Sequence, residues 1–503
     1  MLMRLALSLP LIAFFACAAP VPQAVPAPTP PKVEVAFDAD AEPVLPEPEP
    51  SAIAEERRAI ALELVEEGRS IQQQRGEGGA ADAVDVYQRA LEQDPGCTQA
   101  WWELGWSYQV LSDFEKAVQA WDRLREIDIN YPELATYYPV LVMRRDQAAA
   151  LAALPELGAL PAPEEEPRPG PNIILRAVGD VHMGRGWPEN RARLPPNGGR
   201  DFFAGVRELL QNADVTFGNL ETALKDDGPS SKCGPHSTKC FAFRVPTAFA
   251  DVLKKAGFDV MSIANNHAGD FGPEGRMTTI ESLDRVGIGH SGPVGDIASW
   301  ETKGLKMAMI AFSTGGGVYR IQDIEMAKKV VADVDRTHDL VIVSFHGGAE
   351  GAAAAHVTKN DEKFYGEDRG NVWEFAHAVI DAGADLVLGH GPHRLRAMEI
   401  YKGRLIAFSL GNFSTWETFS LSGALGVSAV LEVSLAANGV VLGAKIHPVV
   451  LEEPGPPQPD AHGQAIKIIR DLSRQDFGQP VFDKHGIYQR SDAHSVAETA
   501  QSS

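Results

Sequence analysis

A third of the way along its length, the chain reads Ile173-Ile174-Leu175-Arg176-Ala177-Val178-Gly179-Asp180-Val181-His182. An apolar run of strand length ends here at two side chains that commonly ligate metals, Asp180 and His182. Four further strand-like runs end similarly: Val215–Phe217 at Gly218-Asn219-Leu220-Glu221, Val260–Ala264 at Asn265-Asn266-His267, Leu340–Phe345 at His346, and Asp385–Leu388 at Gly389-His390-Gly391-Pro392-His393. Because open α/β sheets place their sites at the carboxyl ends of strands, we expect these side chains to converge at one edge of a sheet and to hold a divalent metal.

The strand-like runs alternate with helical stretches, at Phe202–Gln211, Thr247–Ala256, Gly275–Val286 and Trp373–Ala382. This alternation predicts an α/β domain, which we place at residues 172–454. Residues 455–503 contain proline and glutamine with little periodicity. We expect them to form a C-terminal tail that wraps the domain or lacks structure.

Residues 53–151 predict an all-α domain. Their strongest pattern, Trp101-x-x-Leu104-Gly105-x-x-Tyr108 followed by Ala117 and Trp121, resembles the tetratricopeptide repeat. A preceding repeat matches at Ala83, Tyr87, Ala90 and Pro95, although its first helix does not keep the register. The alternative is an ordinary helical hairpin domain. Such repeats dock protein partners. The prolines around Glu164-Glu165-Glu166 predict a linker at residues 152–171.

Residues 1–17 resemble a bacterial lipoprotein signal peptide. The apolar run Leu5–Ala16 is too short to span a bilayer and is typical of a signal sequence. It ends at Cys17, the position at which lipoproteins are cleaved and lipidated. Phe14 is bulkier than the usual leucine, so a plain secretory signal remains the alternative. Residues 18–52, rich in proline and alanine, predict a disordered tether. We therefore expect a periplasmic-facing or extracellular lipoprotein of the cell envelope, held to the membrane by its lipid anchor only.

The charge of the chain limits the kinds of molecule that it can bind. The formal net charge of -22 over 503 residues argues against a nucleic-acid-binding protein. An anionic substrate would need a local positive centre, which a metal ion supplies.

Cys233 and Cys240 flank a short loop and favour a disulfide in an oxidising compartment. Zinc binding is the alternative, but two cysteines and one histidine make an incomplete site. Cys97 is expected to be an inert thiol.

Six segments, taken in order, carry a specific resemblance: Gly179-Asp180, Asn219-Leu220-Glu221, Ala264-Asn265-Asn266-His267-x-x-Asp270-x-Gly272, His346-Gly347-Gly348-x-Glu350, Gly389-His390-x-Pro392-His393 and Ser409-Leu410-Gly411-Asn412-Phe413. The set resembles the CapA family of capsule (poly-gamma-glutamate) synthesis proteins, which share the fold of calcineurin-like metallophosphatases. The resemblance implies a four-layer β-sandwich flanked by helices, and it covers a little under half of the chain.

The resemblance also implies roles for individual residues. It makes His267 the general acid and Asp270 its orienting partner, and it implies one or two ions of Mn, Fe, Zn or Mg. The implied metal ligands are Asp180, His182, Glu221, Asn266, His346, His390 and His393. Asn219, Asn265, Glu350 and Asn412 are expected to contact substrate or to support the ligands. Each histidine has a structural alternative: His182 as a loop or cap residue, and His346 as a satisfied core residue.

Two departures from the metallophosphatase pattern leave alternatives open. Glu221 follows the second strand, where a bridging aspartate is usual, so Glu221 either bridges two ions or the site holds one. His390 and His393 are separated by two residues instead of one, so one of them is expected to face the substrate or to support a ligand. We expect a metal-dependent hydrolase or transferase acting on an anionic exopolymer or on an envelope phosphoester or amide. The alternative is a non-catalytic protein that binds the polymer or serves as a scaffold of the export machinery.

Overall fold

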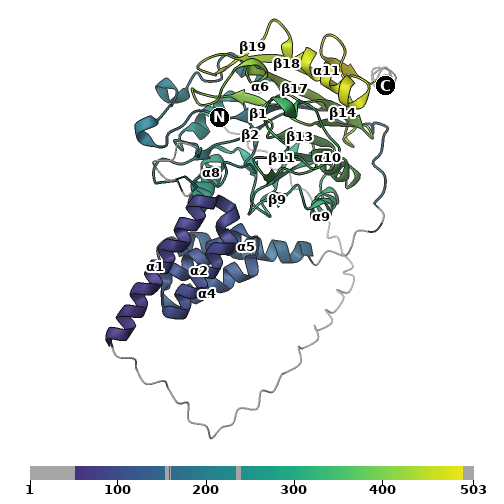
Figure 1. The fold of residues 1–503 in the computed structure, drawn as a ribbon. Coiled ribbons are helices and arrows are strands. Elements are labelled where there is room, and N and C mark those ends of the chain that lie inside the picture. Colours follow the sequence, from purple (N-terminus) through teal and green to yellow (C-terminus); the bar gives the residue numbers. More distant parts are fainter. Residues whose placement is uncertain (1–50, 153–157, 159, 231, 234–239, 491–503) are drawn as a thin grey trace, which may run out of the picture. The chain divides into compact units, whose positions relative to one another are not determined.

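The structure is a computed structural model that describes residues 51–152, 158, 160–230, 232–233 and 240–490. Cys17, the signal peptide and most of the predicted tether lie outside these residues. The first described part is all helical (Figure 1). Its helices are α1 (Ser51–Arg75), α2 (Ala80–Gln93), α3 (Thr98–Val110), α4 (Phe114–Ile127) and α5 (Leu134–Ala152), with a 3-10 turn at Gly76–Gly79.

A glycine allows close approach of the helices in each of two pairs, α1 with α2 and α3 with α4. A Cβ on Gly105 of α3 would lie 2.1 Å from the indole nitrogen of Trp121 in α4, and a Cβ on Gly68 of α1 would lie 2.3 Å from the ring of Tyr87 in α2. Tyr87 and Trp121 keep the repeat spacing, but three extra residues separate Gly68 from its partner helix. This insertion explains why the sequence pattern of the first pair loses its register.

We expect Gly105→Ala to destabilise the helical part by about 1–3 kcal/mol, because the added methyl group overlaps the fully buried Trp121. Denaturant unfolding monitored by tryptophan fluorescence measures the change. Gly78→Ala is the matched control, because no atom lies within 4 Å of a Cβ placed there. Equal stability of the two variants would contradict the close-approach role of Gly105.

The second part contains two large sheets. The nine-stranded sheet has the order β19 (Pro457–Pro459), β18 (Val441–Leu451), β17 (Val427–Leu435), β1 (Ile173–Val181), β2 (Val215–Leu220), β5 (Val260–Ser262) and β6 (Gly289–Ser291), with β16 (Asn412–Ser414) on β1 and β20 (Ile487–Gln489) on β18. The seven-stranded sheet has the order β14 (Met398–Tyr401), β15 (Arg404–Ala407), β13 (Leu386–His390), β10 (Leu340–His346), β8 (Leu305–Ser313) and β7 (Ala298–Thr302), with β9 (Tyr319–Arg320) on β8.

Short elements complete this part. Two small ribbons pair β3 (Ala223–Leu224) with β4 (Arg244–Val245) and β11 (Lys363–Phe364) with β12 (Glu367–Asp368). The helices are α6 (Arg207–Gln211), α7 (Phe249–Ala256), α8 (Gly272–Val286), α9 (Ile324–Asp335), α10 (Val372–Asp381) and α11 (Gln464–Phe477), and 3-10 turns lie at Glu189–Arg191, Pro196–Gly199, Ala352–Ala355 and Gly423–Gly426. The prediction of a mixed α/β domain is confirmed.

Apolar side chains of both sheets share one core. Leu175 and Phe217 of the first sheet belong to the same buried cluster as Ile342 and Leu388 of the second. The opposite face of the first sheet packs with α6 and α7, and that of the second with α9 and α10. Because the central strands are covered on both faces, their sequences read as continuous apolar runs.

The five strand ends singled out in the sequence are divided between the two sheets. β1, β2 and β5 are parallel neighbours in the first sheet, and β10 and β13 are parallel neighbours in the second. The expectation of one sheet edge is therefore wrong, because apolar periodicity does not report which sheet a strand joins. The side chains meet where the carboxyl ends of two packed sheets come together.

Segments assigned to a tail and a linker belong to the folded domain. Ala465, Ile469 and Phe482 join the core between the sheets, so the domain continues to about residue 490 instead of 454. In the linker, the backbone oxygen of Glu164 accepts a hydrogen bond from Arg404, at 2.8 Å. The amide of Asn438 donates to the side chain of Glu164 and to the backbone oxygen of Glu166, both at 2.9 Å.

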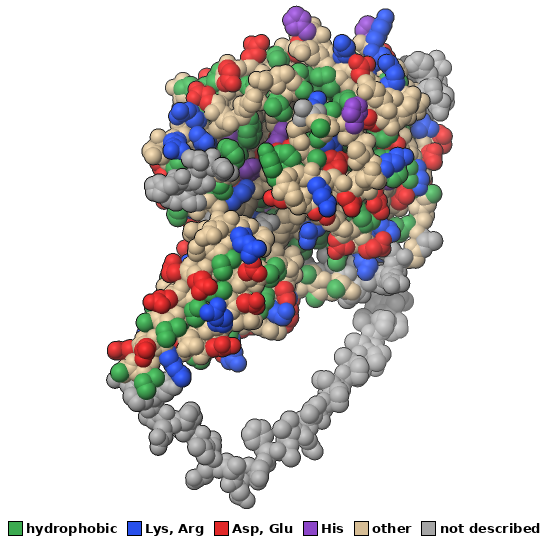
Figure 2. All heavy atoms as spheres, in the orientation of Figure 1, with side chains coloured by type: hydrophobic (Ala, Val, Ile, Leu, Met, Phe, Trp, Pro, Cys, Tyr) green, Lys and Arg blue, Asp and Glu red, His purple; other side chains and the backbone are tan. Residues whose placement is uncertain are grey.

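The described residues contain no helix with the length and apolar character needed to cross a bilayer. On the face shown in Figure 2, lysine and arginine side chains are scattered among acidic ones and form no continuous patch. Cys97 is a buried free thiol, and Cys233 is joined to Cys240 by a disulfide.

Candidate metal centre

Three ligating side chains from different chain segments meet in one place. Asp180 lies in β1, Glu221 directly follows β2, and His393 follows the turn after β13. Ligand atoms of the three residues lie within 4.8 Å of one another. Asp180 and Glu221 are fully buried, while the side chain of His393 keeps 18% of its surface exposed. Two of the three side chains are thus closed to solvent, and His393 is the one that solvent can reach.

Two further histidines join this cluster from the second sheet. His346 and His390 are paired residues at the ends of β10 and β13. Nδ1 of His390 lies 3.2 Å from Oδ1 of Asp180, and Nε2 of His346 lies 3.7 Å from Oε1 of Glu221. The predicted ligands from both sheets therefore surround the same two carboxylates.

Backbone conformation resolves the unusual spacing of His390 and His393. Gly391 has a φ of 113° and His393 a φ of 58°, so the chain turns sharply between the two imidazoles. Nδ1 of His393 lies 3.1 Å from Oδ2 of Asp180, close to the distance found for His390. Both imidazoles contact the carboxylate of Asp180, because the left-handed turn absorbs the extra residue. That one of the two faces the substrate or supports a ligand stays a prediction.

Several buried polar atoms at the site have no hydrogen-bond partner within the described parts of the chain. These atoms are both carboxylate oxygens of Glu221, Oδ1 of Asn266, and Nε2 of His182, His346 and His390. Burying such groups unsatisfied is costly, and native proteins rarely do so without a bound water or ion. Imidazole nitrogens and carboxylate or amide oxygens form the donor set of catalytic divalent metals. The residues present therefore fit a divalent cation.

The protonation states also favour a cation. Burial works to raise the pKa of Asp180, but hydrogen bonds from His390 and His393 and the charges of these imidazoles hold it well below its usual value. Burial lowers the pKa of His182 and of His346, which keeps both in the neutral form that ligates metals.

Glu221 and His393 form a tightly coupled pair in the absence of metal. Burial is the main cause that raises the pKa of Glu221. Burial opposes protonation of His393, but Glu221, Asp180 and Glu350 together raise its pKa to about 10. The proton on His393 thus occupies the position of positive charge that a metal ion would take over.

Amide side chains orient the ligands. Nδ2 of Asn219 donates to Oδ1 of Asp180 at 2.8 Å and lies 3.3 Å from Nδ1 of His346. Asn265 donates to Oδ1 of Asn219 and to the backbone oxygen of Leu220, at 3.2 and 2.9 Å. In metal sites such outer contacts fix ligand geometry, so both asparagines are placed where they can support the ligands, and contact with substrate stays the alternative.

Residues of β16 and of the loop that follows it contact His393 and His182. Oδ1 of Asn412 lies 3.1 Å from Nδ1 of His393, and Oγ1 of Thr418 lies 3.1 Å from Nδ1 of His182. The ring of Phe419 packs against both imidazoles. Sequence analysis missed Thr418 and Phe419, because they stand outside any strand-end pattern.

His267 and Asp270 form a hydrogen-bonded pair beside the cluster. Nδ1 of His267 lies 2.7 Å from Oδ2 of Asp270, which also accepts the backbone N–H of Phe243 at 2.7 Å. A carboxylate holding two donors acts only as an acceptor, so Nδ1 carries the proton and Nε2 remains for other partners. Burial lowers the pKa of His267, and Asp270 opposes this effect.

Glu350 lies at the edge of the site. Arg369, which sequence analysis also missed, donates to Oε1 of Glu350 at 3.1 Å. The guanidinium is buried and also donates to the backbone oxygen of Gly348. The charges of Glu350 and Arg369 both act on Glu221. Glu350 therefore has an electrostatic influence on the cluster without lying among its closest groups.

Comparison with known proteins matches residues 174–415 to the family model described as "Bacterial capsule synthesis protein PGA_cap". The capsule biosynthesis protein CapA of Bacillus anthracis is 28% identical over 330 residues, covering 61% of this chain and 74% of the relative. The PGA biosynthesis protein CapA of Bacillus subtilis is 29% identical over 318 residues, covering 59% and 77%. A purple acid phosphatase from yellow lupin seeds aligns over 58% of this chain and 53% of its own, at 10% identity, but its TM-score of 0.29 establishes no common fold. All the residues of the candidate metal site lie within the matched segment, and residues 174–415 of this chain match the bacterial capsule synthesis protein family.

Proposed function

We propose that the protein is a metal-dependent hydrolase or transferase of capsule or poly-gamma-glutamate biosynthesis that acts on an anionic exopolymer or on an envelope phosphoester or amide. The observation that carries this proposal is the set of buried oxygen and imidazole nitrogen atoms around Asp180 and Glu221 that have no hydrogen-bond partner in the described residues. These potential metal ligands lie next to the His267–Asp270 pair. The names of the two Bacillus relatives support the biosynthetic context.

A divalent cation held at this cluster would supply Lewis-acid chemistry and a lowered pKa for a bound water. Asp180, Glu221, His346, His390 and His393 would hold it, with His182 and Asn266 available for a second ion. As general acid, His267 acts in its imidazolium form: it gives the second proton, on Nε2, to the leaving-group oxygen and becomes the neutral ring, which keeps its Nδ1 proton on Asp270. The ion is Mn, Fe, Zn or Mg, and the two packed sheets form a metallophosphatase-like scaffold.

The proposal extends to location and partners. A lipid on Cys17 would anchor the protein to a membrane of the bacterial envelope, and the Pro- and Ala-rich residues that follow would give the folded parts reach. The helical pairs α1–α2 and α3–α4 would dock protein partners in the manner of tetratricopeptide repeats. Nucleic acid is not among the proposed partners, in keeping with the net charge of -22.

Incubation of the purified full-length protein with poly-gamma-glutamate and Mn²⁺ tests the enzyme proposal. We expect either a shift in the polymer length distribution over time, measured by size-exclusion chromatography, or a steady release of phosphate from phenyl phosphate. Addition of EDTA should stop the reaction. Retention of the polymer on the immobilised protein, with neither reaction in any of the four metals, would favour the non-catalytic polymer-binding alternative.

A further inference from the structure

The carboxylate of Asp270 has contacts with other residues besides His267. Its side chain is fully buried, and both carboxylate oxygens are engaged. Oδ2 accepts from Phe243 and His267, and Oδ1 lies 2.9 Å from the ammonium nitrogen of Lys232. A buried carboxylate is stable only when its charge is compensated. Lys232 places a cation in direct contact with Asp270.

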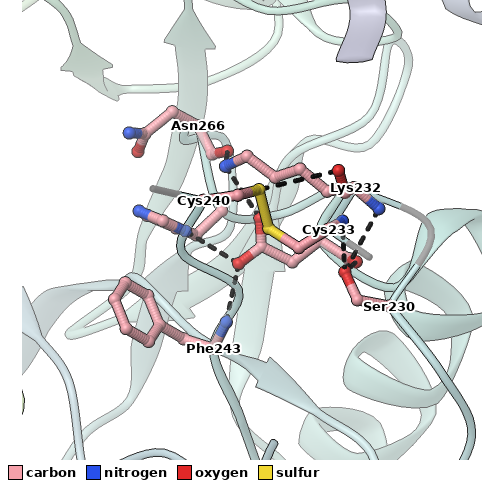
Figure 3. Close-up of a disulfide and its surroundings, with 8 residues drawn as sticks. Ser230, Lys232, Cys233, Cys240, Phe243 and Asn266 are labelled. Carbon is pink, nitrogen blue, oxygen red and sulfur yellow. Dashed lines mark hydrogen bonds and ion pairs between the residues drawn. A yellow bond between two sulfur atoms is a disulfide. The ribbon is translucent and has the colours of Figure 1, made fainter. Parts of the chain in front are cut away.

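The lysine also contacts the segment that carries the metal-facing asparagine. Its Nζ donates to the backbone oxygen of Asn266 at 3.1 Å. A single ammonium group thus contacts both the orienting carboxylate and the backbone directly before His267, as Figure 3 shows for Lys232 and Asn266. Loss of the ammonium group would remove one contact at each end of the segment from Asn266 to Asp270.

The disulfide fixes the backbone from which Lys232 extends. Lys232 directly precedes Cys233, which is 2% exposed and bonded to Cys240. Oγ of Ser230 accepts the backbone N–H of Cys233 at 3.0 Å and donates to the backbone oxygen of Asp270 at 2.7 Å. Sγ of Cys240 lies 3.6 Å from the backbone oxygen of Lys232 (Figure 3). The cross-link and Ser230 therefore hold the lysine backbone against the Asp270 turn.

This arrangement matters because the lysine side chain is not confined by burial. It is 31% exposed, and a lysine side chain has many rotamers available. Anchoring the backbone on both sides of the contact reduces the conformations in which Nζ misses Asp270. We propose that Lys232, held in place by the Cys233–Cys240 disulfide, is a positioning residue that fixes His267 through Asp270. The proposal rests on the proposed role of His267 as general acid.

The first test does not depend on turnover. In the full-length protein, the hydrogen-bonded Nδ1 proton of His267 gives a strongly downfield NMR resonance, assigned by its loss in His267→Gln. We expect Lys232→Met to shift or broaden this resonance and Lys232→Arg to restore it. Reduction with a phosphine, and the double variant Cys233→Ser with Cys240→Ser, should act in the same direction as Lys232→Met.

Lys225→Met is the matched control. Lys225 is a buried lysine on the same chain segment, and its ammonium group pairs with Glu274 instead of Asp270. It should leave the resonance unchanged. An unchanged resonance in folded Lys232→Met would overturn the proposal, whether or not the cysteine variants fold. If Lys232→Met changes the resonance but reduction of the disulfide does not, Lys232 positions His267 without help from the disulfide, and that part of the proposal is wrong.

Kinetics supply the second readout. With Mn²⁺-loaded protein, Lys232→Met should lower kcat for phenyl phosphate about tenfold with little change in KM, and Lys232→Arg should recover most of the loss. Absence of turnover in the wild type would count against the proposed function, but the NMR comparison would still decide the positioning role. A purely structural lysine would lower stability without a kcat-specific loss.

Discussion

Asp180→Asn is expected to strip the protein of divalent metal while leaving it folded. The carboxylate of Asp180 lies within hydrogen-bonding distance of Asn219, His390 and His393, and it shares the candidate metal site with the unsatisfied carboxylate of Glu221. Asparagine keeps the shape of the side chain but removes the negative charge that attracts a cation. Loss of a supporting residue alone typically weakens metal binding 10–100-fold, so we expect a loss of at least about a hundredfold for this ligand.

Elemental analysis and calorimetric Mn²⁺ titration measure this change. Asp214→Asn is the matched control, because Asp214 precedes β2 at the opposite end of the strand and binds the backbone N–H of Ile174. Cation uptake should also release a proton from His393 and weaken as pH falls, since the ion takes the place of the charge stabilised by Glu221. Undiminished metal content in Asp180→Asn would exclude the proposed centre.

The strand ends of this site could be predicted from the sequence because two simple signals coincide there. A continuous apolar run indicates a strand covered on both faces, and a ligating side chain at its end is visible one residue at a time. The pairing of β1, β2 and β5 in one sheet and of β10 and β13 in another could not be predicted. That division depends on which apolar faces pack together, and the runs themselves are nearly identical in composition.

The supporting residues show a second limit of sequence analysis. Asn219 and Asn265 stand within the strand-end motifs, so their roles were predictable. Thr418 and Lys232 reach the site from loops and act through single hydrogen bonds whose geometry depends on the whole fold. The spacing of His390 and His393 shows a related limit, because it does not reveal the left-handed conformations of Gly391 and His393 that bring both imidazoles to Asp180.

His267→Gln is expected to lower kcat by about 10²–10⁴ while leaving bound metal unchanged. The imidazole is nearly buried and is oriented by Asp270, and it does not belong to the three-residue ligand cluster of Asp180, Glu221 and His393. Glutamine retains the volume and a hydrogen bond but cannot transfer a proton. Steady-state kinetics of the Mn²⁺-loaded protein, together with elemental analysis, separate lost proton transfer from lost metal.

The choice of substrate tests the role of His267 more sharply than the rate alone. A general acid matters most when the leaving group is basic, so the loss should be large for phenyl phosphate and small for p-nitrophenyl phosphate. His290→Gln is the matched control, because His290 forms a similar pair with Asp296, at 2.9 Å, on β6 and outside the metal cluster. Equal losses on the two substrates, or a loss of metal in His267→Gln, would show that His267 supports the metal centre instead of protonating the leaving group.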